Sequence, residues 1–118
     1  MKKILVIDDE SQILDLFVDF FDDTDIEVLT ALDGNIAESL VESHHPDLVI
    51  TDMLMPNKEG IEIVQQIRES HPNIKIIAMS GMGNSLYLET SKLLGAELTI
   101  TKPINFTDLK AKVQEMLA

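Results

Sequence analysis

The chain of 118 residues contains no cysteine, and aromatic residues make up only 4% of it. Without cysteine it can form no disulfide, no thiolate zinc site and no thiol nucleophile. A long hydrophobic run is also missing near the start, because only four apolar residues separate Lys3 from Asp8. This run is too short for a signal peptide or a membrane span. We therefore expect a cytoplasmic protein without a membrane role.

Basic residues are scarce: nine lysines and arginines face 21 aspartates and glutamates, which gives a formal net charge of −12. Direct binding to nucleic acid needs a cationic face that displaces counterions, so this balance argues against it. The charge instead favours positive partners or ions. One acidic group, which we expect to be a solvated helix end and turn, consists of Asp19, Asp22, Asp23, Asp25 and Glu27.

Hydrophobic residues make up 45% of the chain, enough for a compact fold with a core of its own. Repeats, linkers and low-complexity tracts do not interrupt the pattern. We expect a single domain over residues 1–118, with no output domain in this chain.

Short apolar segments alternate five times with longer stretches whose apolar residues recur every three or four positions. The short segments, expected as strands, are 3–7, 26–30, 48–50, 74–79 and 98–101. Several are continuous apolar runs, which are typical of strands buried on both faces of a parallel sheet. The alternation predicts right-handed βαβ units and an α/β fold: a (βα)5 doubly wound parallel five-stranded sheet with helices on both faces.

Local signals mark some of the helix ends. We expect Asn35 to cap the second helix, and Asn105 with Asp108 to form a capping pair for the last one. The histidines lie at helix ends away from the other chemically useful residues, and we expect all three to be surface residues: His44, His45 and His71.

Chemically useful side chains follow four of the five expected strands. Asp8 and Asp9 follow the first, Asp52 the third, Ser80 the fourth and Lys102 the fifth. The carboxyl ends of parallel strands meet at one edge of the sheet, where open α/β sheets bind ligands. Each residue alone has an ordinary explanation, such as a turn acid or a snorkelling lysine. Together they predict a site.

Clustered carboxylates repel one another unless a cation is present, and Mg²⁺ suits an open cluster of oxygen ligands. Beside such an ion, a carboxylate such as Asp52 can act as a nucleophile toward phosphorus and form an aspartyl-phosphate. Lys102 fits the role of stabilising charge on the transferring oxygens, and the Ser80 hydroxyl can reorient toward them.

Over its full length the chain resembles a receiver domain of the two-component response regulator family. The matching residues are Asp8-Asp9, Asp52 followed by Met55-Pro56 and Gly60, Ser80, and Lys102-Pro103. The resemblance implies a chemotaxis-regulator-like, flavodoxin-like strand order of 2-1-3-4-5. It also implies a signalling protein, which as an enzyme would only assist its own phosphoryl transfer and autodephosphorylation.

By the same resemblance, Asp52 accepts a phosphoryl group from a sensor histidine kinase or a histidine phosphotransfer protein. Asp9 and Asp52 would ligate Mg²⁺ together with the backbone carbonyl of Leu54, and Asp8 would act through water. Ser80 and Lys102 would contact the phosphoryl group.

The resemblance further implies a cis peptide bond before Pro103, a protein-interaction surface switched through Ser80, and a downstream protein target that the sequence does not identify. One departure is Thr99, where such domains often carry an aromatic residue that rotates on activation. A homodimer through the face from the fourth helix to the fifth helix is one option. Tyr87 and Leu88 would then be either apolar contacts or ordinary core.

Other functions remain open on these residues. An aspartate-nucleophile phosphatase of the haloacid-dehalogenase type would want a second acid where this chain has Leu54. A nucleotide-binding flavodoxin-like protein would want a glycine-rich turn where it has Asp8, Asp9 and Glu10. A receiver-like scaffold that is never phosphorylated would not need the acids, hydroxyl and lysine together.

Overall fold

The computed structural model describes residues 1–53, 60–81 and 85–118. Strands and helices alternate along the chain, as the sequence predicts. The strands are β1 (Lys3–Ile7), β2 (Glu27–Ala31), β3 (Leu48–Asp52), β4 (Lys75–Ser80) and β5 (Leu98–Thr101). The helices are α1 (Ser11–Phe20), α2 (Gly34–His44), α3 (Gly60–Ser70), α4 (Ser85–Leu93) and α5 (Phe106–Met116).

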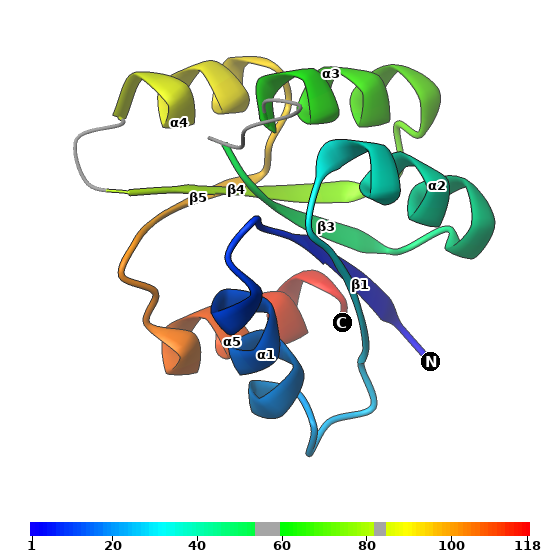
Figure 1. Cartoon of the computed structure of the whole chain (residues 1–118), viewed down its shortest axis with the longest axis vertical. Coiled ribbons are helices and arrows are strands. Elements are labelled where there is room, and N and C mark those ends of the chain that lie inside the picture. Colours follow the sequence, from blue (N-terminus) through cyan, green and yellow to red (C-terminus); the bar gives the residue numbers. More distant parts are fainter. Residues whose placement is uncertain (54–59, 82–84) are drawn as a thin grey trace.

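The five strands form one parallel sheet in the order β2-β1-β3-β4-β5. Helices α1 and α5 cover one face of this sheet, and α2, α3 and α4 cover the other (Figure 1). The predicted fold class, the strand order and the placement of helices on both faces are therefore confirmed.

The central strands are buried on both faces because their side chains point alternately into two separate cores. In β1, Ile4 and Val6 join the core beneath α1 and α5, whereas Leu5 and Ile7 join the core beneath α2, α3 and α4. All five residues of β3 are buried. This explains why the central strands read as continuous apolar runs rather than as alternating patterns.

The core beneath α1 and α5 is rich in phenylalanine. Phe17 is fully buried and meets the Phe106 ring edge-on, with 5.0 Å between the ring centroids. Phe20 lies against the same Phe106 ring at 5.3 Å, and Phe21 is also buried. These are all four phenylalanines of the chain. We call this layer the phenylalanine face.

The opposite core, beneath α2, α3 and α4, is aliphatic. Ala37 and Val41 of α2 meet Ile63, Val64 and Ile67 of α3 above the sheet. A small groove remains between α2 and α3.

Several local predictions need correction. The cap of α2 is Asp33 and not Asn35, because Asp33 has an extended backbone and its side chain accepts a hydrogen bond from the Ile36 N–H. Asn35 already lies inside the helix, which begins at Gly34. Strands β2 and β4 begin and end one residue later than predicted, since their neighbours in the sheet set the register.

Other local predictions are confirmed. The Asn105 side chain accepts a hydrogen bond from the Asp108 N–H at the start of α5, and the Lys102–Pro103 peptide bond is cis. The acidic residues from Asp19 to Glu27 are exposed. Leu93, the last residue of α4, is 88% exposed. Among the helices of the described residues, none is both long and apolar enough to cross a membrane.

The histidine prediction is only partly right. His44 and His45 are exposed, but the His71 side chain is 21% exposed and its ring lies 2.9 Å from the Glu42 carboxylate. The contact arises because His71 directly follows α3, whose C-terminal end packs beside α2.

Candidate functional site

Four predicted site residues lie at the carboxyl edge of the sheet. Asp52 and Ser80 are the last residues of β3 and β4, while Asp8 and Lys102 come directly after β1 and β5. The strand order makes β1, β3, β4 and β5 consecutive neighbours, so their carboxyl ends lie side by side. This shared edge gathers residues that lie far apart in the sequence.

Lys102 joins the two buried carboxylates of the site. Its ammonium Nζ donates to Asp8 Oδ2 at 2.9 Å and to Asp52 Oδ2 at 3.3 Å. A third contact, at 3.4 Å, reaches Glu10 Oε1. One cation therefore lies among three carboxylates, which reduces the repulsion that clustered negative charges would otherwise suffer.

The site is largely withdrawn from solvent. Asp8 and Ser80 have no exposed surface, and Asp52 is 5% exposed. Burial raises the pKa of the Asp8 carboxyl, and this effect outweighs the opposing hydrogen bonds from the Glu10 N–H and from Lys102. The buried charge of Asp8 is thus only partly compensated.

The pKa of Lys102 is raised, although burial alone would lower it. Desolvation favours a lower pKa for Lys102, but the hydrogen bond to Asp8 and the charges of Asp52 and Asp8 outweigh it, so the pKa of Lys102 lies above its usual range. The shift at Lys102 favours its charged form and the shift at Asp8 disfavours its charged form, because the lysine has several anionic neighbours, whereas Asp8 has one cation and loses its water. Lys102 is consequently a fixed positive charge at this edge.

Ser80 provides a hydroxyl group without an assigned role in the resting fold. Its Oγ is buried and, within the described part of the chain, has no hydrogen-bond partner. A buried polar atom without a partner is costly and calls for an explanation, such as a ligand that arrives later. The Ser80 carbonyl accepts from the Lys102 N–H at 2.7 Å, which ties the backbones of these two residues together.

Gly60 keeps the backbone beside Asp52 close to α3. A Cβ atom at this position would lie 2.5 Å from the Asp52 carbonyl oxygen and 2.6 Å from Met53 Cα. Both neighbours are backbone atoms, so a larger residue would have to displace the end of β3. The glycine at position 60 is therefore required by this close approach.

A group of acidic ligand atoms also lies at this edge. One carboxylate oxygen from each of Asp8, Asp9 and Glu10 lies within 4.8 Å of the others. Asp8 is buried, while Asp9 and Glu10 are exposed toward solvent. Hard carboxylate oxygens with open positions suit Mg²⁺, so the donor chemistry fits such an ion. Leu54, whose carbonyl the resemblance assigns as a ligand, and Met55-Pro56 fall outside the described residues.

The structure adds Glu10, whose contact with Lys102 the sequence did not reveal; the only signal was its position directly after Asp8 and Asp9. Thr99 is half-buried in β5. Of the suggested dimer contacts, Leu88 packs partly buried against the aliphatic core, and the Tyr87 side chain falls outside the description.

Comparisons with known proteins agree with this arrangement. A family model described as "Response regulator receiver domain" matches residues 4–114. Regulatory protein VanRc of Enterococcus gallinarum is 33% identical over 116 residues, which cover 98% of this chain and 50% of that protein. Sporulation initiation phosphotransferase F of Bacillus subtilis is 32% identical over 116 residues, covering 98% of this chain and 94% of its own length. The chain spans about half the length of several other curated relatives.

Solved structures match as well. A CheY-like response regulator receiver domain protein from Methanospirillum hungatei superposes with a TM-score of 0.93 at 29% identity, covering 99% of this chain and 94% of that one. A receiver domain protein from Clostridium thermocellum gives a TM-score of 0.91 at 31% identity, covering 98% and 94%. Because the family model matches residues 4–114, nearly the whole chain, this chain belongs to the response regulator receiver domain family.

Proposed function

We propose that Asp52 accepts a phosphoryl group from a phosphohistidine on a partner protein, and that the modified domain passes a signal through a changed interaction surface. The observation that carries this proposal is the contact of the Lys102 ammonium with both Asp8 and Asp52 at the carboxyl edge of the sheet. It places a fixed positive charge beside a carboxylate that can act as a nucleophile.

In the proposed step, an oxygen of Asp52 forms a bond to phosphorus while the bond from phosphorus to the donor imidazole nitrogen breaks. The electron pair of the broken bond stays on the imidazole nitrogen, which takes up a proton. Lys102 is 3.3 Å from Asp52 Oδ2, near enough to follow the charge onto the phosphoryl oxygens. Its release from Asp8 would accompany this change.

Mg²⁺ would be held by Asp9 and Asp52, with the Leu54 carbonyl as a third protein ligand and Asp8 acting through water. When bound, the ion neutralises charge on the phosphoryl oxygens. The proximity of the Asp8, Asp9 and Glu10 oxygens supports this part of the proposal.

The Ser80 hydroxyl would find its partner in a phosphoryl oxygen. It is buried at the end of β4 without another hydrogen bond in the described part of the chain, so a new acceptor at Asp52 would attract it. Because Ser80 accepts from the Lys102 backbone, its movement would be felt at the end of β5 as well. The surface near α4 and β5 would thereby report phosphorylation, with Thr99 in place of an aromatic switch.

Receiver domains of response regulators interact with histidine kinases. We propose a sensor histidine kinase or a histidine phosphotransfer protein as the donor, in the cytoplasm, with a protein as the downstream target. Relatives named as transcriptional regulators are about twice this length, whereas the phosphotransferase relative matches over 94% of its own. Both a regulator module and a phosphorelay member are therefore consistent with the proposal, and so is a homodimer through the α4 to α5 face.

The test is incubation with acetyl phosphate and Mg²⁺, followed by intact mass measurement. We expect a single phosphoryl adduct on the wild type and none on Asp52→Asn. Asp19→Asn serves as the matched control because it removes an exposed aspartate near the C-terminal end of α1. An unmodified wild type, or an adduct that survives in Asp52→Asn, would refute the proposal, and steady release of phosphate over many turnovers would favour a phosphatase.

A further inference from the structure

A groove between α2 and α3 lies among residues that the phosphoacceptor site does not use. Its floor is apolar and consists of the buried residues Ala37, Val41, Ile63 and Ile67. The cavity has a volume of about 50 Å³. A single water needs roughly 10–15 Å³, so the groove has room for a narrow side chain but not for a bulky ligand.

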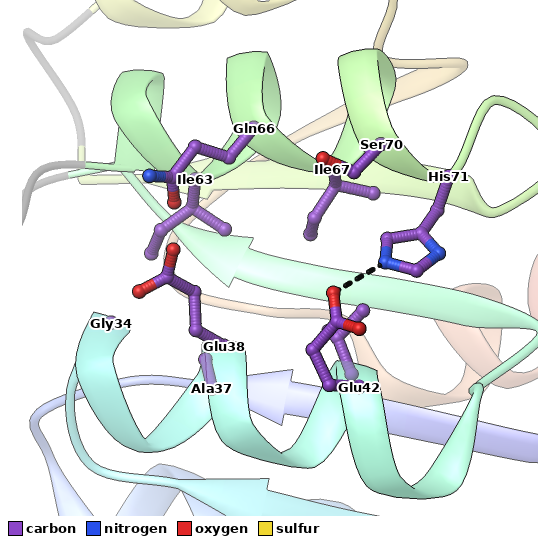
Figure 2. Close-up of a pocket in the computed structure, with 10 residues that line it drawn as sticks. Gly34, Ala37, Glu38, Glu42, Ile63, Gln66, Ile67, Ser70 and His71 are labelled. Atoms are coloured by element: carbon purple, nitrogen blue, oxygen red, sulfur yellow. Dashed lines mark hydrogen bonds and ion pairs between the residues drawn. The ribbon is translucent and has the colours of Figure 1, made fainter.

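Acidic side chains line one side of this groove. Glu38 and Glu42 stand one turn apart on α2, and Figure 2 shows Glu38 pointing across the groove toward Gln66 of α3. At the other end, Glu42 Oε1 lies 2.9 Å from His71 Nε2 (Figure 2). The groove therefore combines an apolar floor with a carboxylate rim.

The surrounding surface is negative. The exposed acids of α2 and α3 are Glu38, Glu42, Glu62 and Glu69. The guanidinium of Arg68 in α3 already has three acceptors: the Pro72 carbonyl at 2.8 Å, the Gly95 carbonyl at 2.8 Å and the Glu97 carboxylate at 2.9 Å. Its charge is consequently occupied away from the groove, and the groove is complementary to a cation.

We propose that this groove receives a lysine side chain from a basic segment of a partner protein. Lysine carries a narrow aliphatic stem that can lie along apolar surface, while its ammonium group stays at the rim. Here the stem would cover Ala37 and Ile63, and the ammonium would meet Glu38 and Glu42. The net charge of −12 favours the approach of such a segment. The surface is separate from Asp52, so binding requires no phosphorylation.

The probe is a short capped peptide of alanine and leucine with a pair of lysines, titrated into the unphosphorylated ¹⁵N-labelled protein at 0.15 M salt. Charges farther apart than about 8 Å are largely screened at this ionic strength. We expect the amide signals of Ile63, Gln66 and Ile67 to shift. A second peptide carries 2,4-diaminobutyric acid in place of lysine, which keeps the ammonium on a shorter stem, and we expect it to bind more weakly.

The decisive variant pair changes charge without changing side-chain size. Glu38→Gln with Glu42→Gln removes both rim charges, and we expect the peptide Kd to rise about three- to tenfold. Glu62→Gln with Glu69→Gln removes two exposed charges of α3 that do not line the groove, and we expect a rise of less than about twofold.

Three outcomes would overturn the proposal: equal loss of binding in both double variants, shifts confined to the amides of Asp8, Asp9 and Glu10, or no binding of the lysine peptide. Equal binding of both peptides would also overturn it, because the stem would then contribute nothing. The fold of each variant is checked from its own amide spectrum before titration.

Discussion

The phenylalanine face beneath α1 and α5 packs its rings among aliphatic side chains, whereas charged side chains gather at the carboxyl edge, although the same strands contribute to both. On the face, Phe17 is fully buried against Phe106, and each buried ring contributes to stability. At the edge, Asp8 is just as deeply buried, but its pKa is raised because it loses water without full compensation.

Burial has opposite effects on stability in the two regions. Removing an aromatic ring from water stabilises the fold, while removing a carboxylate from water destabilises it unless a partner compensates. We infer that the packed face provides the stability that allows the edge to hold poorly satisfied groups such as the Ser80 hydroxyl. Such a trade between stability and function is common at functional sites.

The largest effect is expected on the phenylalanine face. Phe17→Ala should lower the free energy of unfolding by about 3–5 kcal/mol, since it removes a buried ring and leaves a cavity. Urea unfolding followed by circular dichroism measures this change. Phe17→Leu is the control and should lose clearly less. A loss below that of Phe17→Leu would show that the face is not the main store of stability.

Gly60→Ala should affect both stability and the carboxyl edge. The new Cβ would overlap the Asp52 carbonyl oxygen and Met53 Cα, so we expect a loss of about 1–3 kcal/mol in stability from overpacking. Displacement of Asp52 should also slow formation of the phosphoryl adduct about tenfold or more. Intact mass against time measures that rate. Glu69→Ala, exposed on the same helix, should change neither quantity, and an unchanged adduct rate in Gly60→Ala would contradict the role given to this glycine.

Asp8→Asn should stabilise the protein at neutral pH by about 0.5–2 kcal/mol, since it removes a buried charge while Lys102 keeps Asp52 and Glu10. The folded pKa of Asp8 lies above its ordinary value of 3.8, so the native state binds the proton more readily. Below pH 3.8 the wild type and the variant should be equally stable. As pH rises from 3.8 toward the folded pKa of Asp8, the wild type should lose stability relative to the variant.

Urea midpoints measured across this pH range without Mg²⁺ provide the test. Asp19→Asn, which replaces an exposed acid, controls for the loss of one charge. If Asp8→Asn were less stable than the wild type at neutral pH, the ion pair with Lys102 would outweigh the burial of Asp8.

The smallest effect is expected at the cap of α5, between Lys102 and the phenylalanine face. Asn105→Ala removes the acceptor for the Asp108 N–H and should lower the free energy of unfolding by about 0.5–1 kcal/mol. The effect is small because Asn105 is exposed and water can replace the lost acceptor. Asn105→Asp keeps an acceptor and should be close to neutral. A loss of phosphoryl adduct formation in Asn105→Ala would show that the cap also positions Lys102.

Much of the fold follows from the sequence, because the apolar periods of strands and helices are local properties of the chain. The run of buried residues in β3 and the cap at Asn105 are examples. The prediction at Asn35 is wrong because Asp33 and Asn35 are both residue types that cap helices, and only the backbone path selects Asp33. Leu93 follows the helical spacing but is exposed, since spacing alone does not show where the neighbouring elements end.

The sequence by itself determined that acids, a hydroxyl and a lysine stand at strand ends, because those positions follow the apolar runs directly. Tertiary structure alone decided which of them meet: the contacts of Lys102 with Asp8 and Asp52 join residues 94 and 50 positions apart. The same holds for Glu42 and His71, 29 positions apart, and for the groove beside them. These depend on strand order and helix packing, which sum many weak contacts over the whole chain and are not properties of any single segment.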